Sequence, residues 1–237
     1  LYIDKGFIKG NDNQEISFSG EMVNTLNENR TLKLQFPEAP ISDAAGLLSP
    51  LMPEAFREFK TSGYATMDLV FLNLLYPQSR WGGKLSFRNS SLSGNYGGAL
   101  LSVKDINGTI TIKDNVSSKN PLADVMGDHL KLSKSIFQKF LTSFKESNLK
   151  KEDLDFLTIN EIKYGILTFD NVEIALEVDR DKINLRRLIS NLFRGNIYGA
   201  GLLKFNSDQS DYNISLLFNE ISLEGISERL SPNQEYI

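Results

Sequence analysis

The sequence predicts a mainly β fold, an antiparallel meander that also contains one long amphipathic helix and one or two short helices. Apolar residues alternate with polar ones in segment after segment, and this period of two puts them on one face of a strand. Turn-forming residues separate the segments, as expected for strands joined by tight reversals. The spacing leaves no room for the crossover helices that parallel strands need.

The alternation is clearest in six segments, in which the intervening residues are largely polar or small. These segments contain Leu32, Leu34 and Phe36; Ala65, Met67, Leu69 and Phe71; Leu85 and Phe87; Ile106, Ile110 and Ile112; Val172, Ile174, Leu176 and Val178; and Tyr212, Ile214, Leu216 and Phe218. Each is predicted to be a strand with one apolar face.

Five clusters of glycine, asparagine, aspartate and serine are predicted to be tight reversals between these strands. They lie at residues 10–13, 93–95, 105–108, 170–171 and 206–211. Three glycines also start a short strand that ends in phenylalanine, at residues 83–87, 165–169 and 201–205. The matches suggest repeated hairpin units.

Helical periodicity accompanies start signals in two regions. Asn120 and Pro121 can begin an amphipathic helix whose apolar residues recur at spacings of three, four and seven from Leu122 to about Ser147. Residues 42–48 and 53–60 are predicted to form short helices. We therefore expect one domain over residues 1–237, with sheet portions at 1–116 and 149–237 and a helical insertion at 117–148.

Composition restricts the classes of function. The chain has 237 residues, of which 41% are hydrophobic and 24% charged, which predicts a folded globular chain. Its 26 basic and 30 acidic residues are interspersed, so no basic block is available for nucleic acid. There is no cysteine, and the longest apolar run, residues 67–76, is too short to span a bilayer as a helix.

No group of residues matches a catalytic, metal or cofactor site, so we expect a protein that is not an enzyme. His129 is the single histidine and lies on the predicted helix, without the partners that zinc or a catalytic triad would need. Residues 195–201 are rich in glycine but lead into a strand, which is unlike a phosphate-binding loop. The acidic residues read as solvated loops and turns: Glu152, Asp153, Asp155, Asp179, Asp181, Asp208 and Asp211.

Two stretches resemble the AsmA-like proteins of the bacterial cell envelope, the group that includes AsmA and TamB. In residues 47–115, a short helical piece precedes a long strand, the segment Gly82-Gly83-Lys84-Leu85-Ser86-Phe87 and the segment Ile106-Asn107-Gly108-Thr109-Ile110. The second match is stronger. It covers residues 193–226, from Phe193-Arg194-Gly195-Asn196 to Leu223-Glu224-Gly225-Ile226, and is similar to the family's C-terminal module.

This resemblance implies a long curled sheet whose apolar concave face forms a groove or half-closed sheet. It also implies a periplasmic location, in a full-length protein that is anchored to the inner membrane by regions outside these residues. The implied role is outer-membrane biogenesis through phospholipid transport, and the implied partners are phospholipid or another acyl-chain lipid and envelope proteins. The predicted helix is longer than the family pattern, and it could plug or cover the groove.

The apolar strand faces are the candidate functional surface. Under the lipid hypothesis the groove is lined by Leu69, Phe71, Leu85, Phe87, Leu203 and Phe205. The alternative is a structural or protein-interaction module of the periplasm, in which the same side chains form a closed core and bind no lipid. Alternation fits an open groove and a packed sandwich equally well, so both hypotheses stay open at this point.

Overall fold

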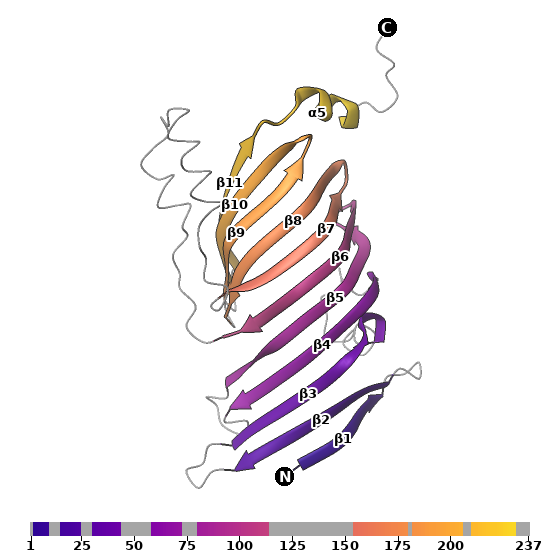
Figure 1. Cartoon of the computed structure of the whole chain (residues 1–237), viewed down its shortest axis with the longest axis vertical. Coiled ribbons are helices and arrows are strands. Elements are labelled where there is room, and N and C mark those ends of the chain that lie inside the picture. Colours follow the sequence, from indigo (N-terminus) through magenta and orange to yellow (C-terminus); the bar gives the residue numbers. More distant parts are fainter. Residues whose placement is uncertain are drawn as a thin grey trace.

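Eleven strands of a computed structural model form one open antiparallel sheet in which every strand pairs with its neighbours in the sequence (Figure 1). The structure describes residues 2–9, 15–24, 30–43, 58–72, 80–113, 154–179, 182–205 and 210–230. The strands are β1 (Tyr2–Lys9), β2 (Glu15–Asn24), β3 (Arg30–Pro40), β4 (Lys60–Leu72), β5 (Arg80–Tyr96), β6 (Ala99–Ile112), β7 (Asp155–Tyr164), β8 (Leu167–Val178), β9 (Lys182–Leu192), β10 (Gly195–Phe205) and β11 (Ser210–Asn219). Helix α5 (Leu223–Leu230) follows β11.

The mainly β meander predicted from the alternation is confirmed, and all six alternating segments lie in strands. The long helix predicted from Leu122 to Ser147 lies outside the described residues, as does most of the two short helices. Residues 41–43 are helical, and β4 begins at Lys60, where the second short helix was expected to end. No helix in the described ranges is long and apolar enough to cross a bilayer.

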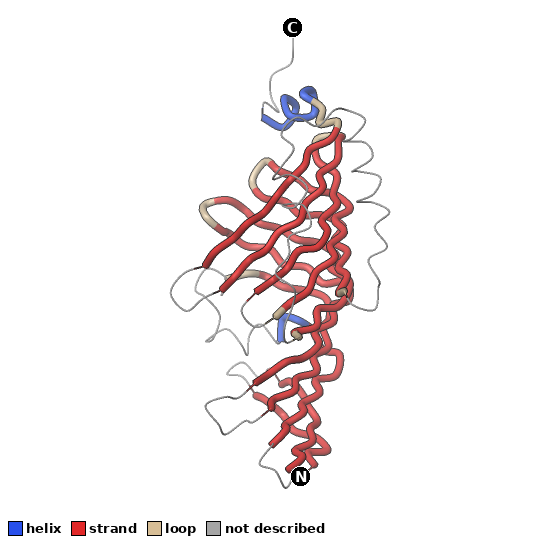
Figure 2. Tube along the Cα trace, turned by 90° about the vertical axis from the view of Figure 1, so that its left-hand side faces the viewer, coloured by secondary structure: helices blue, strands red, loops and turns tan. Residues whose placement is uncertain are grey.

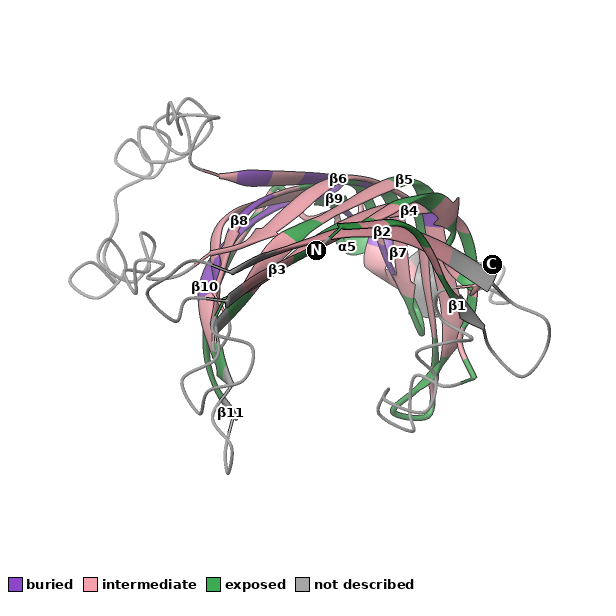
Figure 3. Ribbon diagram, turned by 90° about the horizontal axis from the view of Figure 1, so that it is seen from below, coloured by how far each residue is buried: buried purple, intermediate pink, exposed green. Residues whose placement is uncertain are grey.

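The sheet is one curved layer. Seen from the side, the strands follow one another as a single twisted surface (Figure 2). Seen along its length, the sheet bends into an arch (Figure 3). Strand twist and bulges both curve an antiparallel sheet, and several bulges are present.

A line of residues with positive φ crosses the middle of the sheet. Gly63 on β4, Asn89 on β5, Asp105 on β6 and Asn171 on β8 all have this conformation. The pairing register shifts close to each, as it does at β-bulges. Asparagine, aspartate and glycine tolerate positive φ better than other residues, which explains their place in this line.

Three of the predicted reversals lie inside strands, two of them at these bulges. Residues 93–95, 105–108 and 170–171 lie inside β5, β6 and β8, so the chain does not reverse there. The described turns are instead at Gly97 and Gly98, at Gly165 and Ile166, and at Phe193 and Arg194. The residue types that permit positive φ suit bulges and turns alike, so composition alone did not distinguish them.

Two buried serines satisfy backbone groups beside the bulges. The Ser90 hydroxyl donates to the Tyr64 carbonyl oxygen at 2.9 Å, and the Ser190 hydroxyl donates to the Asp170 carbonyl oxygen at 3.1 Å. Each serine is 1% exposed. Bulges release ladder carbonyls, and a buried carbonyl without a partner is costly, so these serines hold the bent region together.

Asp155 ends the ladder where β7 begins. Its carboxylate accepts hydrogen bonds from the Thr111 backbone N–H at 2.7 Å and the Thr111 hydroxyl at 2.8 Å. Just beyond this point β6 meets β8 directly, with Ile112 opposite Val178. This acid, assigned to a solvated loop from the sequence, is instead 7% exposed and completes the pairing of β6.

The buried core lies in the C-terminal half of the sheet. Its apolar members, each less than 9% exposed, come from β7, β8, β9 and β10: Leu157, Ile159, Val172, Ala175, Leu176, Leu192, Ile197, Tyr198 and Ala200. Ile197 and Tyr198 are adjacent on β10, so their side chains point to opposite faces, and both are buried. Strand β10 is therefore covered on both faces, whereas the described residues of β1–β4 contain no buried side chain.

Replacing Gly63 with alanine should destabilise the protein strongly, because a β-carbon there would lie 2.2 Å from the Asn89 carbonyl oxygen at a φ of +88°. We expect a loss of about 3 kcal/mol or more in the free energy of unfolding, measured with urea. Gly98→Ala is the matched control. Gly98 has a φ of +82° but no atom within 4 Å of the added carbon.

Strain alone at Gly98 should cost about 1 kcal/mol. Equal losses for the two variants would show that the close approach of β4 to β5 is not rigid.

Candidate functional site

The pairing register gathers the apolar side chains of the sheet onto one face. Residues directly opposite each other in an antiparallel pair share a face, so a row can be followed from strand to strand. One row runs through Ile3, Gly20, Leu34, Leu69, Gly83, Ile112, Val178, Ile183, Leu203 and Tyr212. This row crosses ten strands and contains no charged residue.

A second row lies beside the first. It contains Phe36, Met67, Leu85 and Ile110, and it extends to Phe18, whose ring centroid is 5.7 Å from that of Phe36. We define the apolar face as the side of the sheet that carries these two rows and the residues that alternate in phase with them. Leu32, Phe71 and Trp81 are opposite one another on this face, as are Ala65 and Phe87.

Most of the predicted groove residues meet on the apolar face. Leu69 and Phe71 on β4 and Leu85 and Phe87 on β5 are neighbours in register and are half-buried. Leu203 belongs to the same row but lies on β10, five strands beyond β5. Phe205 pairs with Ser210 in the backbone register, and its side chain lies outside the description.

Sequence reasoning missed several residues of this face. Met67, Ile110, Ile112 and Val178 were recognised as strand residues but were not assigned to the groove, although they alternate in phase with it. Trp81 was missed altogether. Trp81 lies opposite Phe71 only because of the pairing register between β4 and β5. The Trp81 side chain is 42% exposed.

Glycines let large side chains lie across the apolar face. A β-carbon on Gly20 would be 2.9 Å from Leu34 Cδ2, and one on Gly83 would be 3.0 Å from Leu69 Cδ2. A β-carbon on Gly199 would likewise be 2.9 Å from Leu216 Cδ2. In each pair the leucine occupies the space above the glycine of the neighbouring strand, which makes the surface apolar even where no side chain is present.

The opposite face of the N-terminal strands carries charged and polar side chains, although Val70 and Leu72 of β4 also lie on it. Lys33, Gln35, Asp68 and Lys84 alternate with the apolar residues and are exposed. Asp68 lies opposite Lys84, so opposite charges face each other across β4 and β5. On the same face the hydroxyls of Ser86 and Thr109 are hydrogen-bonded at 3.0 Å.

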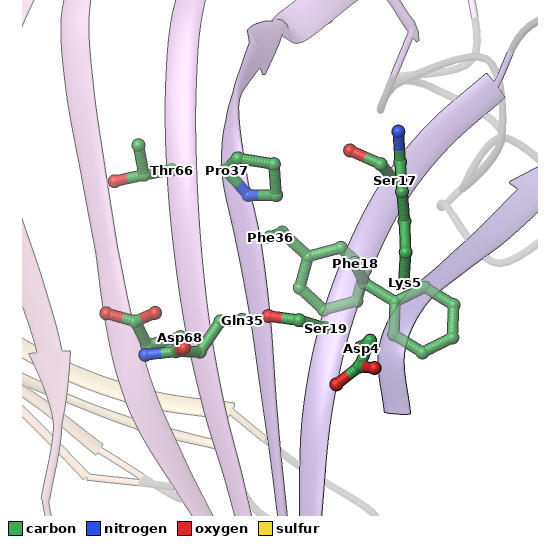
Figure 4. Close-up of a pocket in the computed structure, with 10 residues that line it drawn as sticks. All are labelled: Asp4, Lys5, Ser17, Phe18, Ser19, Gln35, Phe36, Pro37, Thr66 and Asp68. Atoms are coloured by element: carbon green, nitrogen blue, oxygen red, sulfur yellow. The ribbon is translucent and has the colours of Figure 1, made fainter. Parts of the chain in front are cut away.

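A shallow pocket of about 550 Å³ is formed by β1, β2, β3 and β4 (Figure 4). It is lined by Asp4, Lys5, Ser17, Phe18, Ser19, Gln35, Phe36, Pro37, Thr66 and Asp68. Most of these side chains are hydroxyl, amide or charged groups, which do not suit an acyl chain. The pocket adjoins the apolar face, because Phe18 and Phe36 of the second row also line it.

Asp179, like Asp155, has a structural partner. Asp179 lies 3.5 Å from the Lys182 ammonium, and its backbone N–H donates to the Lys182 carbonyl oxygen at 2.8 Å. No three residues of the metal-binding types cluster within the described ranges. His129, Glu152, Asp153, Asp181 and Asp208 lie outside those ranges, and Asp211 is exposed on β11.

A charged group lies close to the turns on one side of the sheet. Glu161 on β7 lies 2.7 Å from the ammonium of Lys104 on β6 and 2.7 Å from that of Lys163 on its own strand. Hydrogen bonds from Lys104 and then from Lys163 hold the pKa of Glu161 below its ordinary value. Both ammonium groups favour the charged carboxylate.

No family model, curated protein or solved structure matches this chain. The geometry of the apolar face and its chemistry are therefore the basis for assigning a function.

The ion pairs of Glu161 predict a pH dependence of stability. Because its pKa is lowered in the folded state, Glu161 stabilises the protein above its unfolded value, 4.5, and this contribution is lost as the pH falls through the folded value. The difference in unfolding free energy between wild type and Glu161→Gln, measured with urea, should be largest near pH 7 and should shrink in acid. A difference that stays constant from neutral pH to acid would contradict this prediction.

Proposed function

We propose that this chain is a non-catalytic segment of a bacterial envelope protein that holds lipid acyl chains along its apolar face. In this role it supports outer-membrane biogenesis through phospholipid transport. The observation that carries the proposal is the row from Ile3 to Tyr212, which crosses ten strands without a charged residue. An acyl chain needs such a continuous apolar surface, because each buried CH₂ contributes about 0.8 kcal/mol and a charge in its path would interrupt it.

The length of this surface suits a lipid. Neighbouring strands lie about 4.8 Å apart, so a row of ten strands extends over roughly 40 Å along the curve of the sheet. That distance exceeds the hydrocarbon thickness of a bilayer, about 30 Å. A lipid can therefore lie along the row at any of several positions, as movement along a groove requires.

The proposal places the apolar face on the inner side of the arch in Figure 3. This placement is supported by a difference in burial between neighbouring residues. Leu34, Leu69 and Leu85 are half-buried, whereas Lys33 and Lys84, on the opposite face of the same strands, are exposed. Side chains on a concave face converge and cover one another, and those on a convex face spread apart.

Location and partners are part of the same proposal. The resemblance of residues 47–115 and 193–226 to AsmA-like proteins suggests a periplasmic protein that is anchored to the inner membrane through other regions. Phospholipid is the proposed ligand, and neither a catalytic residue nor a cofactor is part of the mechanism. The chain's role is to keep the acyl chains away from water.

A second function has one observation in its favour. On β10 both faces of the sheet are covered, as the burial of Ile197 and Tyr198 on the same strand requires. A closed region of this kind is what a structural or protein-interaction module would contain. In that case the open part of the apolar face would be a contact surface for another envelope protein.

Photocrosslinking from neighbouring positions should distinguish the two faces. A benzophenone amino acid at Leu85 or Phe71 should form covalent adducts with co-purified phospholipid, detected as a mass shift of the intact protein. The same amino acid at Lys84 is the matched control, because alternation points it to the polar face. Equal yields at Lys84 and Leu85, or adducts at neither position, would contradict the lipid groove.

Removing apolar bulk should reduce lipid retention more than stability. The double variant Leu69→Ala with Phe71→Ala should lose most of the phospholipid measured in an organic extract, with only a small change in unfolding free energy because both side chains are half-buried. Leu157→Ala, in the core at 8% exposure, should instead cost about 2 to 4 kcal/mol. If the groove variant unfolds as readily as Leu157→Ala, its side chains are ordinary core and the proposal fails.

A further inference from the structure

The two edges of the open sheet differ in the features that prevent an edge strand from pairing. Strand β1 contains Asp4, Lys5 and Lys9. Its pairing register with β2 shifts between Ile3 and Gly6, as at a bulge. Charged side chains, lysine above all, and bulges are the means by which natural proteins keep an edge strand from pairing with another chain. The edge at β1 is therefore protected.

Strand β11, at the other edge, has none of these features. Its residues include no proline, lysine or arginine, and Asp211 is the single charged residue among them. The register with β10 runs without a shift from Asn219 opposite Asn196 to Ser210 opposite Phe205, so no bulge bends the strand. Among the described strands β11 pairs with β10 alone, so one row of its backbone N–H and C=O groups faces outward.

Helix α5 folds away from this edge. The backbone N–H of Ser222 donates to the Phe193 carbonyl oxygen at 3.0 Å, and Arg194 lies 2.9 Å from Glu224. Phe193 and Arg194 form the turn between β9 and β10, and Figure 1 shows α5 next to that turn. The helix therefore leads from β11 back across β10, and within the described residues the outer edge of β11 is uncovered.

Large apolar side chains alternate along β11 on the apolar face. The four are Tyr212, Ile214, Leu216 and Phe218, with exposed fractions of 78%, 45%, 42% and 54%. On their inner side they lie opposite β10, but no described strand lies on their outer side. A strand added at this edge would pair with the outward backbone groups and shield these side chains from water, which is the mode of recognition called β-augmentation.

The order of residues in β11 favours a second copy of β11 as that added strand. In an antiparallel pair centred on Ser215, Tyr212 lies opposite Phe218 of the second copy. Ile214 then lies opposite Leu216 of the second copy. Aromatic residues thus face aromatic ones and aliphatic residues face aliphatic ones, which stabilises cross-strand pairs. Residues opposite each other share a face, so the apolar faces of both copies lie on the same side of the joined sheet.

Charge also favours this arrangement over pairing of β11 with β1 of another copy. Around Ser215, Asp211 lies opposite Asn219 of the second copy, so like charges do not meet. Pairing with β1 would place its lysines and its bulge at the junction. Such head-to-tail contacts also continue from copy to copy without closing, whereas a two-fold contact closes as a dimer.

We propose that two copies of this chain form a dimer through the outer edges of β11, paired antiparallel about a two-fold axis at Ser215. Residues 211–219 of each copy form the junction, with roughly eight to ten backbone hydrogen bonds between them. The apolar face then continues from one copy into the other. The dimer stands whether or not that face carries lipid.

Cysteine crosslinking tests the position of the axis, because the chain contains no cysteine. Ser215→Cys places two thiols directly opposite each other, with β-carbons about 5 Å apart, close enough for a disulfide. Mild oxidation of the full chain should convert most of this variant to a linked dimer on a denaturing gel. Asp211→Cys is the matched control. The shift from position 211 to 219, at about 3.4 Å per residue, separates its two thiols by roughly 27 Å, so it should stay monomeric.

Charge reversal tests the cross-strand pairs. The double variant Ile214→Lys with Leu216→Lys should raise the dimer dissociation constant at least about tenfold, measured by sedimentation, because lysines would face lysines across the axis. Ile214→Glu with Leu216→Glu should do the same, and mixing the two variants should restore a dimer that contains one of each. The two side chains are 45% and 42% exposed, so circular dichroism and melting temperature should not change.

Phe7→Lys at the opposite edge is the control for the charge variants. Phe7 on β1 is 47% exposed, and its replacement should leave the dimer unchanged. A wild-type chain that stays monomeric at every concentration would overturn the proposal, as would equal crosslinking of Ser215→Cys and Asp211→Cys. Dissociation by Phe7→Lys would overturn it as well, because it indicates pairing between β1 and β11.

Photocrosslinking to co-purified lipid at Leu85, repeated in the double lysine variant, separates the dimer from the lipid groove. Adducts should persist there, because Leu85 lies on β5, far from β11 in the strand order. A dimer without lipid adducts would contradict the groove alone, and adducts on a strictly monomeric wild type would contradict the dimer alone.

Discussion

The fold depends on the pairing register of its strands. With a side-chain period of two, a slip of one residue between two strands would move every apolar side chain of one strand to the opposite face. Lys33, Asp68 and Lys84 would then interrupt the row that now contains Leu34, Leu69 and Gly83. Continuity of the apolar face and correct register are therefore the same requirement, repeated at each strand pair.

Firm packing is concentrated in one part of the sheet, although the apolar row crosses ten strands. The buried apolar side chains lie on β7, β8, β9 and β10, and β10 has buried side chains on both faces. The described residues of β1–β4 have half-buried apolar side chains on one face and exposed polar ones on the other. A binding surface must leave apolar side chains uncovered, and this lowers the stability of the strands that carry it. The buried side chains of the C-terminal strands supply most of the packing instead.

The sequence predicted the strands well because alternation is a direct consequence of backbone geometry. Leu32 to Phe36, Ala65 to Phe71 and Val172 to Val178 all follow it, and all lie in strands. Reversals were harder. Asp105 and Asn171 adopt positive φ inside strands, where they bend the sheet, whereas the true turn at Gly97 and Gly98 lies just beyond the predicted one at residues 93–95.

The candidate site was predictable only in part, for a physical reason. Alternation showed which residues of β4 and β5 share a face, so Leu69, Phe71, Leu85 and Phe87 could be grouped. It could not show which residues of distant strands share a row with them. That depends on every intervening register shift, including the direct contact of Ile112 with Val178. The alternation of a strand also does not show whether its apolar face is covered by other parts of the protein or is open to solvent.

The order of the strands also determines how the protein comes apart and reforms. Apart from the short pairing of β6 with β8, each described strand pairs only with the strands that precede and follow it in the sequence. Most loops that must close during folding are therefore short. The segments between β3 and β4 and between β6 and β7 are longer, and the two halves of the sheet join across the second of them. The folding of each strand is then coupled mainly to the folding of its neighbours, as in repeat proteins. Amide hydrogen exchange should accordingly be fastest at β1 and slow progressively towards β8, so that the thinly packed N-terminal end opens while the C-terminal strands remain folded.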